Sequence, residues 1–272
     1  MKWLKSIEDF TQHIFTNKER AAKRHLNTDD AEKPREVYER VCQLIAEELS
    51  AIGFKYFPSQ HKLKLESTDK KHNLTIQFSS NRDNVAGQYI ELSVAFFVKS
   101  KDLKSYAKSN PLLDYWDDTM IGRNIAALVK EGKGNLIWNL AEKKEYENAI
   151  ALIPKIAREE LSYIFEKLQD SEWVADAIEE DSFELNNPIV TVQYLLMVDQ
   201  KHIAEKYLSA FLIRKPDQIL VGYKKAKEKF KSEGMPETFT HGLGFGHEIA
   251  LLENEYQLKL TVRDPASGTQ SI

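Results

Sequence analysis

The stretch "HKLKLESTDKKHNLTIQFS" (residues 61–79), together with "YIELSVAFFV" (89–98), decides the fold class. Apolar and polar residues alternate through Leu63 and Leu65, then from Leu74 to Phe78, and again from Ile90 to Val98. A period of two is typical of strands that bury one face and expose the other. The connections between these runs are short and polar, so the sequence predicts an antiparallel meander.

A helix is predicted directly before the strands, over "PREVYERVCQLIAEELS" (34–50). Pro34 suits the first helical turn, and the apolar residues that follow recur at helical spacing. Gly53 is expected to end this helix in a left-handed conformation. Because a half-apolar sheet and an amphipathic helix each need a partner to bury against, we expect the helix to cover the sheet.

Composition excludes several classes of protein. The chain has 272 residues and a formal net charge of −4, which is not the basic balance of a nucleic-acid-binding protein. Its single cysteine, Cys42, cannot form an intrachain disulfide, and the charged N-terminus lacks the apolar core of a secretion signal. No window approaches eighteen uncharged apolar residues, so no membrane span is expected. These features indicate a cytoplasmic protein.

Further elements are predicted on either side of the meander. Residues 3–26 are expected to form a polar helix, "MIGRNIAALVKEG" (120–132) a short helix and "NLIWNL" (135–140) a strand. A long helix is expected from about Glu142 to Gln169, and Pro154 should break or kink it. Together these elements predict an α+β domain over residues 1–169, with an antiparallel sheet covered by helices.

The composition changes after Gln169. Residues 170–185 contain seven acidic residues and no basic ones, and we interpret them as a junction. Residues 186–272 are predicted to be a helical segment, in which the first two helices form a hairpin. The first 185 residues hold 27 basic and 32 acidic residues, a net charge of −5, whereas the remainder carries +1.

The glycine-rich stretch "THGLGFGHEIALL" (240–252) resembles a phosphate-binding loop at first sight. A dinucleotide-binding loop, however, follows a strand and begins a helix. Here a lysine-rich helix is expected before the glycines, and the alternation after them favours a C-terminal β-hairpin over a short helix. We therefore interpret the stretch as a flexible hinge that leads into this hairpin.

Two groups of residues are candidates for a site. In "DYWDDT" (114–119) aromatic rings lie among acids, which is typical of a protein contact surface, although capping of a helix is the simpler interpretation. The candidate partner-binding residues are Tyr115, Trp116, Asp117, Asp118 and Arg123. A metal site is the alternative, formed either by Asp114, Asp117 and Asp118 or by His241, His247 and Glu248.

Six short pieces of the first 170 residues resemble a family of uncharacterised bacterial α+β domains. They are "LSAIGFKYF" (49–57), "LTIQF" (74–78), "YIELSVAFFV" (89–98), "IGRNIAAL" (121–128), "LIWNL" (136–140) and "IAREELSYIFEKL" (156–168). The resemblance implies no catalytic residues. It implies an immunity-type role, since some members are thought to neutralise toxins, and it does not extend beyond residue 170.

The hypothesis from the sequence is a non-enzymatic cytoplasmic binding protein with no cofactor, no nucleic-acid or membrane partner and an unknown oligomeric state. An acidic N-terminal part favours a basic protein as its partner, through electrostatic steering. A metal-dependent hydrolase that uses the aspartate cluster or the His241, His247 and Glu248 group is the alternative.

Overall fold

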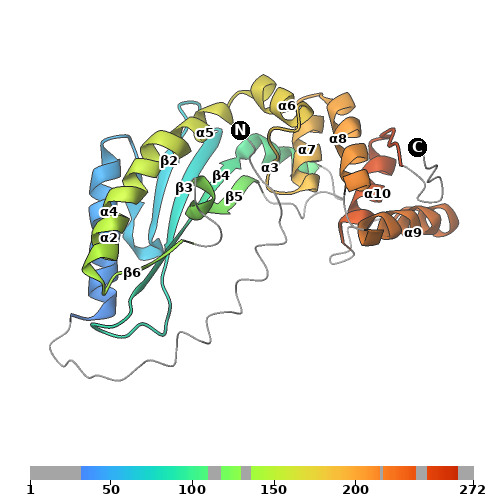
Figure 1. Cartoon of the computed structure of the whole chain (residues 1–272). Coiled ribbons are helices and arrows are strands. Elements are labelled where there is room, and N and C mark those ends of the chain that lie inside the picture. The colour runs from blue at the N-terminus through green and yellow to red at the C-terminus, as the bar shows by residue number, and fades with distance from the viewer. Residues whose placement is uncertain (1–31, 110–117, 130–135, 215–216, 237–243, 263–272) are drawn as a thin grey trace, which may run out of the picture. The chain divides into compact units, whose positions relative to one another are not determined.

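The structure is a computed structural model that describes residues 32–109, 118–129, 136–214, 217–236 and 244–262 (Figure 1). It divides into two compact units. The α+β unit contains the described residues of 32–99 and 121–169. The helical unit contains those of 100–120 and 170–262. The fold class predicted from the sequence, α+β, is confirmed.

Helix α2 (Pro34–Ser50) begins at the predicted proline and ends at the predicted place. Its apolar stripe is fully buried at Val41, Ile45 and Leu49, where no side-chain surface remains exposed. Gly53 has a φ of 92°, which a side chain rarely tolerates, so the chain can turn sharply into the sheet at this point. Both sequence expectations for this segment are confirmed.

The sheet of the described residues has six strands and confirms the predicted meander. β1 (Lys55–Phe57), β2 (Lys62–Glu66), β3 (His72–Ser79) and β4 (Glu91–Ser100) lie in sequence order, and the register of β2 on β3 pairs Leu63 with Ile76. The alternate residues that were predicted to face inwards are buried along β3 and β4. β5 (Thr119–Asn124) and β6 (Ile137–Asn139) both neighbour β4.

One prediction inside this unit is wrong. Residues 120–132 were expected to form a short helix, but β5 (Thr119–Asn124) and a 3₁₀ turn, η4 (Ile125–Leu128), occupy their described part. Thr119, Met120 and Ile121 are buried one after another, as in a strand that is covered on both faces. A short apolar run of this kind fits helix and strand equally well, and pairing with β4 decides between them.

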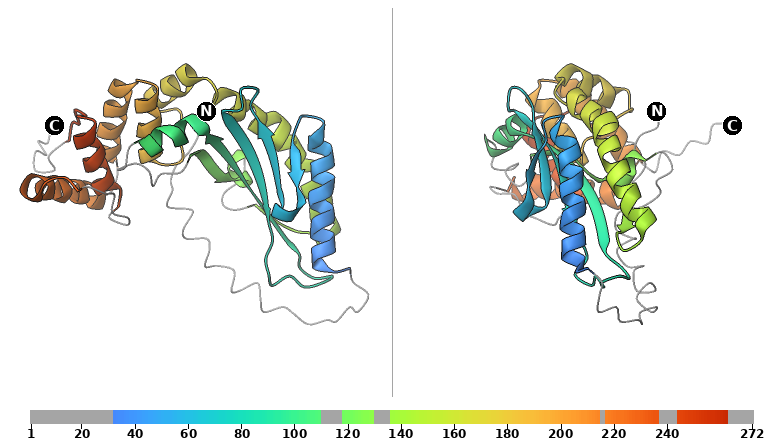
Figure 2. Two further views of the ribbon diagram at one scale, coloured as in Figure 1. Left: turned by 180° about the vertical axis from the view of Figure 1, so that it is seen from behind. Right: turned by 90° about the vertical axis from the view of Figure 1, so that its left-hand side faces the viewer.

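Helices cover one face of the sheet (Figures 1 and 2). α4 (Lys143–Ile156) packs beside α2, and the Arg158 guanidinium bonds to the Glu48 carboxylate between them. α4 continues through Pro154, so the helix does not break at the predicted residue. A π-helical turn, η5 (Ala157–Leu161), follows α4 and leads into α5 (Ser162–Lys167).

The helical unit comprises six described helices. They are α3 (Lys101–Ser109), α6 (Ser171–Glu179), α7 (Pro188–Met197), α8 (Lys201–Arg214), α9 (Asp217–Glu233) and α10 (Phe245–Glu255). The predicted hairpin is present as α7 and α8, which pack on each other. The acidic segment 170–185, interpreted as a junction, contains α6, and α6 packs against α8.

The C-terminal β-hairpin is a wrong prediction. Residues Phe245–Glu255 form α10, and Leu258 to Thr261 have no regular structure. The backbone N–H groups of Lys259 and Thr261 donate to side chains of α8, Glu205 and Ser209, at 2.9 Å each. These side chains therefore satisfy the donors that a second strand would otherwise have paired.

Candidate functional site

The candidate partner-binding residues are only partly described. Tyr115, Trp116 and Asp117 lie outside the described residues, as does Asp114. The Asp118 carboxylate lies 3.6 Å from the Lys104 ammonium and is 14% exposed. The Arg123 guanidinium donates to the carbonyl of its neighbour Gly122 at 2.8 Å. Asp118 thus pairs with a residue of α3 and Arg123 bonds to its own backbone segment, and the role of both in binding stays a prediction.

The candidate metal residues divide in the same way. His241 lies outside the described residues, whereas His247 and Glu248 are consecutive on α10. The His247 ring packs edge-on against Phe230 with 5.2 Å between the ring centroids, and Glu248 is buried. Within the described ranges no three histidine, cysteine, aspartate or glutamate side chains come close enough to hold a metal ion.

The glycine stretch has a packing role that the sequence did not reveal. Gly244 precedes α10 with a φ of 83°. At Gly246 an added Cβ would lie 2.2 Å from the Ile219 carbonyl oxygen and 2.6 Å from the Tyr223 nitrogen. Only glycine permits so close an approach of two helix backbones. The second and third glycines of the sequence motif therefore serve the start of α10 and its crossing with α9.

Glu248 is the most unusual titratable group of the helical unit. One of its carboxylate oxygens is buried without a hydrogen-bond partner among the described residues. Burial raises the pKa of Glu248 to about 7. At neutral pH the charged and uncharged forms of this carboxyl are thus both populated. Its neighbour His247 shifts the other way, since burial and then the nearby Lys229 lower its pKa.

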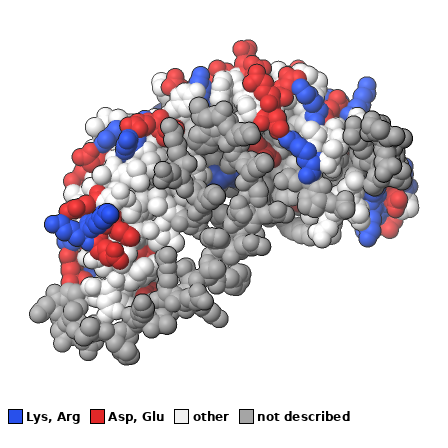
Figure 3. Space-filling view, in the orientation of Figure 1, with Lys and Arg blue, Asp and Glu red and all other residues white. Residues whose placement is uncertain are grey.

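Acidic side chains gather over α6, in the helical unit (Figure 3). Glu172, Asp176 and Glu180 are exposed and follow one another at a spacing of four residues. Glu179 and Asp181 instead pair with Lys206 and Arg214 of α8. The acidic segment therefore has one side that joins α8 and one side that faces solvent.

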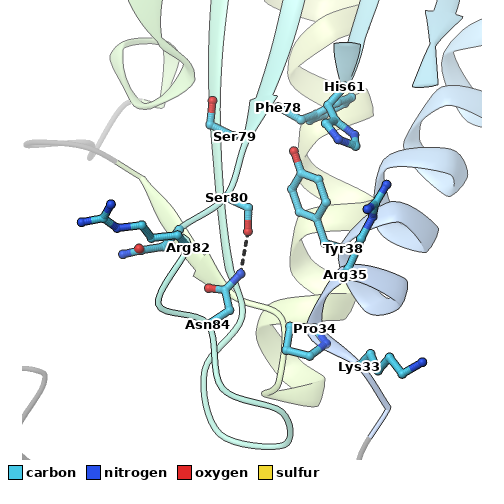
Figure 4. A pocket seen from close by; sticks show the side chains of 11 residues that line it. Lys33, Pro34, Arg35, Tyr38, His61, Phe78, Ser79, Ser80, Arg82 and Asn84 are labelled. Carbon is cyan, nitrogen blue, oxygen red and sulfur yellow. Dashed lines mark hydrogen bonds between the residues drawn. The ribbon is translucent and has the colours of Figure 1, made fainter. Parts of the chain in front are cut away.

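The α+β unit contains a pocket of about 740 Å³ (Figure 4). It opens between the first turn of α2, residues 33–38, and the end of β3 with the connection that follows, residues 78–84. His61, directly before β2, completes the lining. The three segments are far apart in the sequence, and the meander brings them together at one end of its strands.

The wall formed by the β3–β4 connection is held by a ring of hydrogen bonds. The Asn84 amide donates to the Ser80 hydroxyl at 2.7 Å, and that hydroxyl donates to the Glu91 carbonyl at 2.6 Å. The Glu91 N–H in turn donates a hydrogen bond to the Asn84 side-chain oxygen at 2.9 Å. Because every member is bonded to the other two, this wall is preorganised for binding.

The floor is built from aromatic and imidazole rings. Tyr38 and His61 meet edge to face with 5.2 Å between centroids, and Phe78 is buried beside them (Figure 4). His61 has a φ of 46°, in the left-handed region, and its Nδ1 is buried without a hydrogen-bond partner in the described part of the chain. Such an orphaned ring nitrogen costs free energy that a structural histidine normally avoids.

A buried thiol lies behind the floor. Burial raises the pKa of Cys42 to about 12, and the nearby hydroxyls of Tyr38 and Tyr56 offset only part of this shift. Burial likewise raises the pKa of Tyr56 to about 12. The thiol is therefore protonated at neutral pH and is not activated as a nucleophile. Cys42 is therefore a buried side chain of the core.

The rim of the pocket carries Lys33, Arg35 and Arg82 and no carboxylate. Lys33 lies 3.6 Å from Glu36, and Arg35 lies 2.7 Å from Glu39. Both pairs are exposed, so each contributes little and leaves its cation accessible. Arg82 forms no ion pair or hydrogen bond through its side chain with the described residues. The sequence offered no signal for this rim, because Lys33 and Arg35 lie at the start of a helix and Arg82 lies far along the chain in a loop.

The chain was compared with known proteins in three ways. It matches no model of a protein family, no curated protein and no solved structure. A search of the described helices finds none that is both long and apolar enough to cross a membrane.

Proposed function

We propose that the chain is a non-enzymatic binding protein of the cytoplasm, and that another protein docks at the pocket of the α+β unit. The observation that carries this proposal is the pocket itself, which is open to solvent and polar at its rim. Sites for small molecules usually enclose most of the ligand in an apolar lining. A pocket that is open to solvent and carries cations at its rim is better suited to a charged group that projects from a larger partner.

Further features support the proposal. The site lies where segments meet at the ends of strands, and binding residues are often found on loops that a rigid scaffold positions. Catalysis is favoured where a site closes and excludes water, whereas this pocket is open. The buried, protonated Cys42 is compatible with the reducing cytoplasm. The immunity-type role is carried only by the resemblance of residues 1–170 to the bacterial family.

Site-specific photocrosslinking tests the proposal. The photoreactive residue p-benzoylphenylalanine replaces Ser79 at the rim of the pocket, and the variant is irradiated in its native cells. The matched control carries the same residue at Ser50, an exposed serine at the opposite end of α2. We expect a discrete adduct with one protein from position 79 and none from position 50. No adduct at position 79, or the same adduct from both positions, would contradict the proposal.

A further inference from the structure

We infer that the pocket binds an acidic segment of the partner protein, with its carboxylates spread along the rim. This inference rests on the proposed function, which supplies a protein as the ligand. It adds the chemistry of the segment that enters the pocket. The first ground is charge, because the rim carries three cationic side chains and no carboxylate.

The second ground is the helix terminus at the rim. Lys33 and Arg35 flank the start of α2, which has no side-chain cap. Pro34 has no N–H group, and the Glu36 N–H donates to the Lys33 carbonyl at 2.9 Å. The N-terminus of a helix carries a partial positive charge, so cations there are unfavourable and anions are favoured. The nearby Glu32 is held by Arg40 in a two-bond pair. An incoming carboxylate would therefore be favoured at this helix start, beside the exposed pairs of Lys33 with Glu36 and of Arg35 with Glu39.

The third ground is the direction of the cationic side chains. In Figure 4 Arg35 extends towards His61, whereas Lys33 and Arg82 extend away from the pocket on its two opposite sides. A single phosphate group is bound best by donors that converge on one point. Cations that are spread along two rims instead match several carboxylates in a row. This arrangement favours an acidic peptide segment over a small anion.

Unused donors occur between the two rims. The Ser79 hydroxyl is exposed, and no acceptor for it exists within the described ranges. The Arg82 guanidinium, with five N–H groups, is likewise unused. Because charge-assisted hydrogen bonds to carboxylates are stronger than neutral ones, these donors provide specific anchors beside the general attraction.

The segment that enters the pocket has the opposite sign to the basic partner that the overall charge predicts. The expected basic partner and the expected acidic segment concern interactions over different ranges, long-range attraction in the first case and direct contact in the second. The net charge of the chain steers the approach of the whole partner, whereas the pocket contacts a few side chains. A basic protein that presents one acidic segment satisfies both.

The probe is a fluorescent hexaglutamate peptide, and its binding to the full chain is measured by anisotropy. The net charge of −4 repels such a peptide as a whole, so binding reports a local cationic site. We expect a Kd below about 1 mM at low salt that weakens as salt rises, and no binding of a hexalysine peptide to this site. Inorganic phosphate should compete no better than its ionic strength predicts.

Two double variants make the test specific. Arg35→Gln with Arg82→Gln removes two charges from the rim, and Lys144→Gln with Lys155→Gln removes two exposed charges from α4. We expect the rim variant to weaken binding about tenfold and the α4 variant less than about twofold. Circular dichroism checks that both variants are folded.

Several results would overturn the inference. The first is that hexaglutamate does not bind. The second is that both double variants weaken the binding of hexaglutamate equally. The third is that phosphate displaces the peptide at concentrations at which chloride has no effect. An adduct from position 79 without hexaglutamate binding would refute the acidic segment and leave the proposed function standing. Hexaglutamate binding at the rim without any adduct would support the acidic chemistry and refute docking of a protein partner there.

Discussion

In the α+β unit the long-range hydrogen bonds run largely between backbone groups of neighbouring strands, whereas in the helical unit they run between side chains of neighbouring helices. The register of β2 on β3 is a backbone ladder of five residue pairs. Lys206, Arg214 and Lys227 instead pair with carboxylates that lie on other helices or connections. A backbone ladder holds its loops in place whatever their side chains, so the α+β unit is the better scaffold for a binding pocket.

The largest effect is expected where the helical unit depends on close packing. Gly246→Ala would place a Cβ 2.2 Å from the Ile219 carbonyl oxygen, so α9 and α10 must move apart. We expect a loss of about 3 kcal/mol, at the upper end for overpacking. Hydrogen exchange of the α9 and α10 amides measures this loss.

Gly222→Ala is the matched control on the facing helix. An added Cβ there meets its nearest neighbour, the Gly246 Cα, at 3.8 Å, which is ordinary contact. Alanine is a better helix former than glycine, so we expect a gain of about 0.5 to 1 kcal/mol. If both variants lost stability equally, the close crossing at Gly246 would not be the cause.

The next effect concerns the buried carboxyl of the helical unit. The pKa of Glu248 is raised to about 7 from 4.5, so the folded chain keeps a proton that the unfolded chain releases. Stability therefore falls as the pH rises from about 4.5 to about 7, and this contribution is constant above that range. We expect Glu248→Gln to be more stable than the wild type by about 3 kcal/mol at pH 8 and equal to it at pH 4.

Thermal unfolding of the wild type and of Glu248→Gln across this pH range provides the measurement. Glu253→Gln is the control, because Glu253 is paired with Lys227 at 2.8 Å and accepts a bond from Tyr223 at 2.7 Å. That variant should lose stability at pH 8 instead of gaining it. A pH profile of Glu248→Gln parallel to that of the wild type would show that Glu248 is not responsible.

A smaller loss of stability is expected when a side-chain amide that bonds to several backbone groups of the α+β unit is removed. The Asn139 side chain accepts from the Ile90 N–H at 2.9 Å and donates to the Gln88 carbonyl at 3.0 Å. Asn139→Ala leaves both backbone groups without this partner, so we expect a loss of about 1 to 2 kcal/mol. Asn148→Ala removes one bond to the Trp138 indole and should cost less. Chemical denaturation compares them, and equal losses would argue against the hub.

The smallest effect is expected on the solvent side of α6. Asp176 lies four residues from both Glu172 and Glu180, and like charges at this spacing weaken a helix. Asp176→Lys converts both repulsions into attractions and should stabilise the helical unit by about 0.5 kcal/mol at low salt. The gain in melting temperature should shrink in high salt. A gain that is independent of salt would show that charge is not its origin.

Long elements were predictable from the sequence, whereas among the short ones β2 and β6 were predicted and β1 and β5 were not. The apolar stripe of α2 and the alternation along β3 and β4 extend over enough residues to separate a period of 3.6 from a period of 2. β1 has three residues and β5 has six, which is too few. In α10 the apolar run is buried on consecutive residues, so the alternation that suggested a hairpin carried no information.

The pocket could not be predicted from the sequence for a different reason. Its residues belong to three segments that carry no shared motif, and only the pairing of β2 with β3 brings His61 next to Phe78. A positive φ at His61 has no sequence signature, because the residue that adopts it is not glycine. The motifs that attracted attention in the sequence, the glycines and the aspartates, instead serve helix packing or lie outside the described residues.

The comparison of the two units leads to one decisive measurement. Photocrosslinking from Ser79 in the α+β unit is compared with photocrosslinking from Ser171, which is exposed at the start of α6 in the helical unit. Our account predicts that the partner protein is captured from position 79 and not from position 171. Capture from position 171 alone would contradict it, and would place the binding surface on the acidic side of α6 instead of at the pocket.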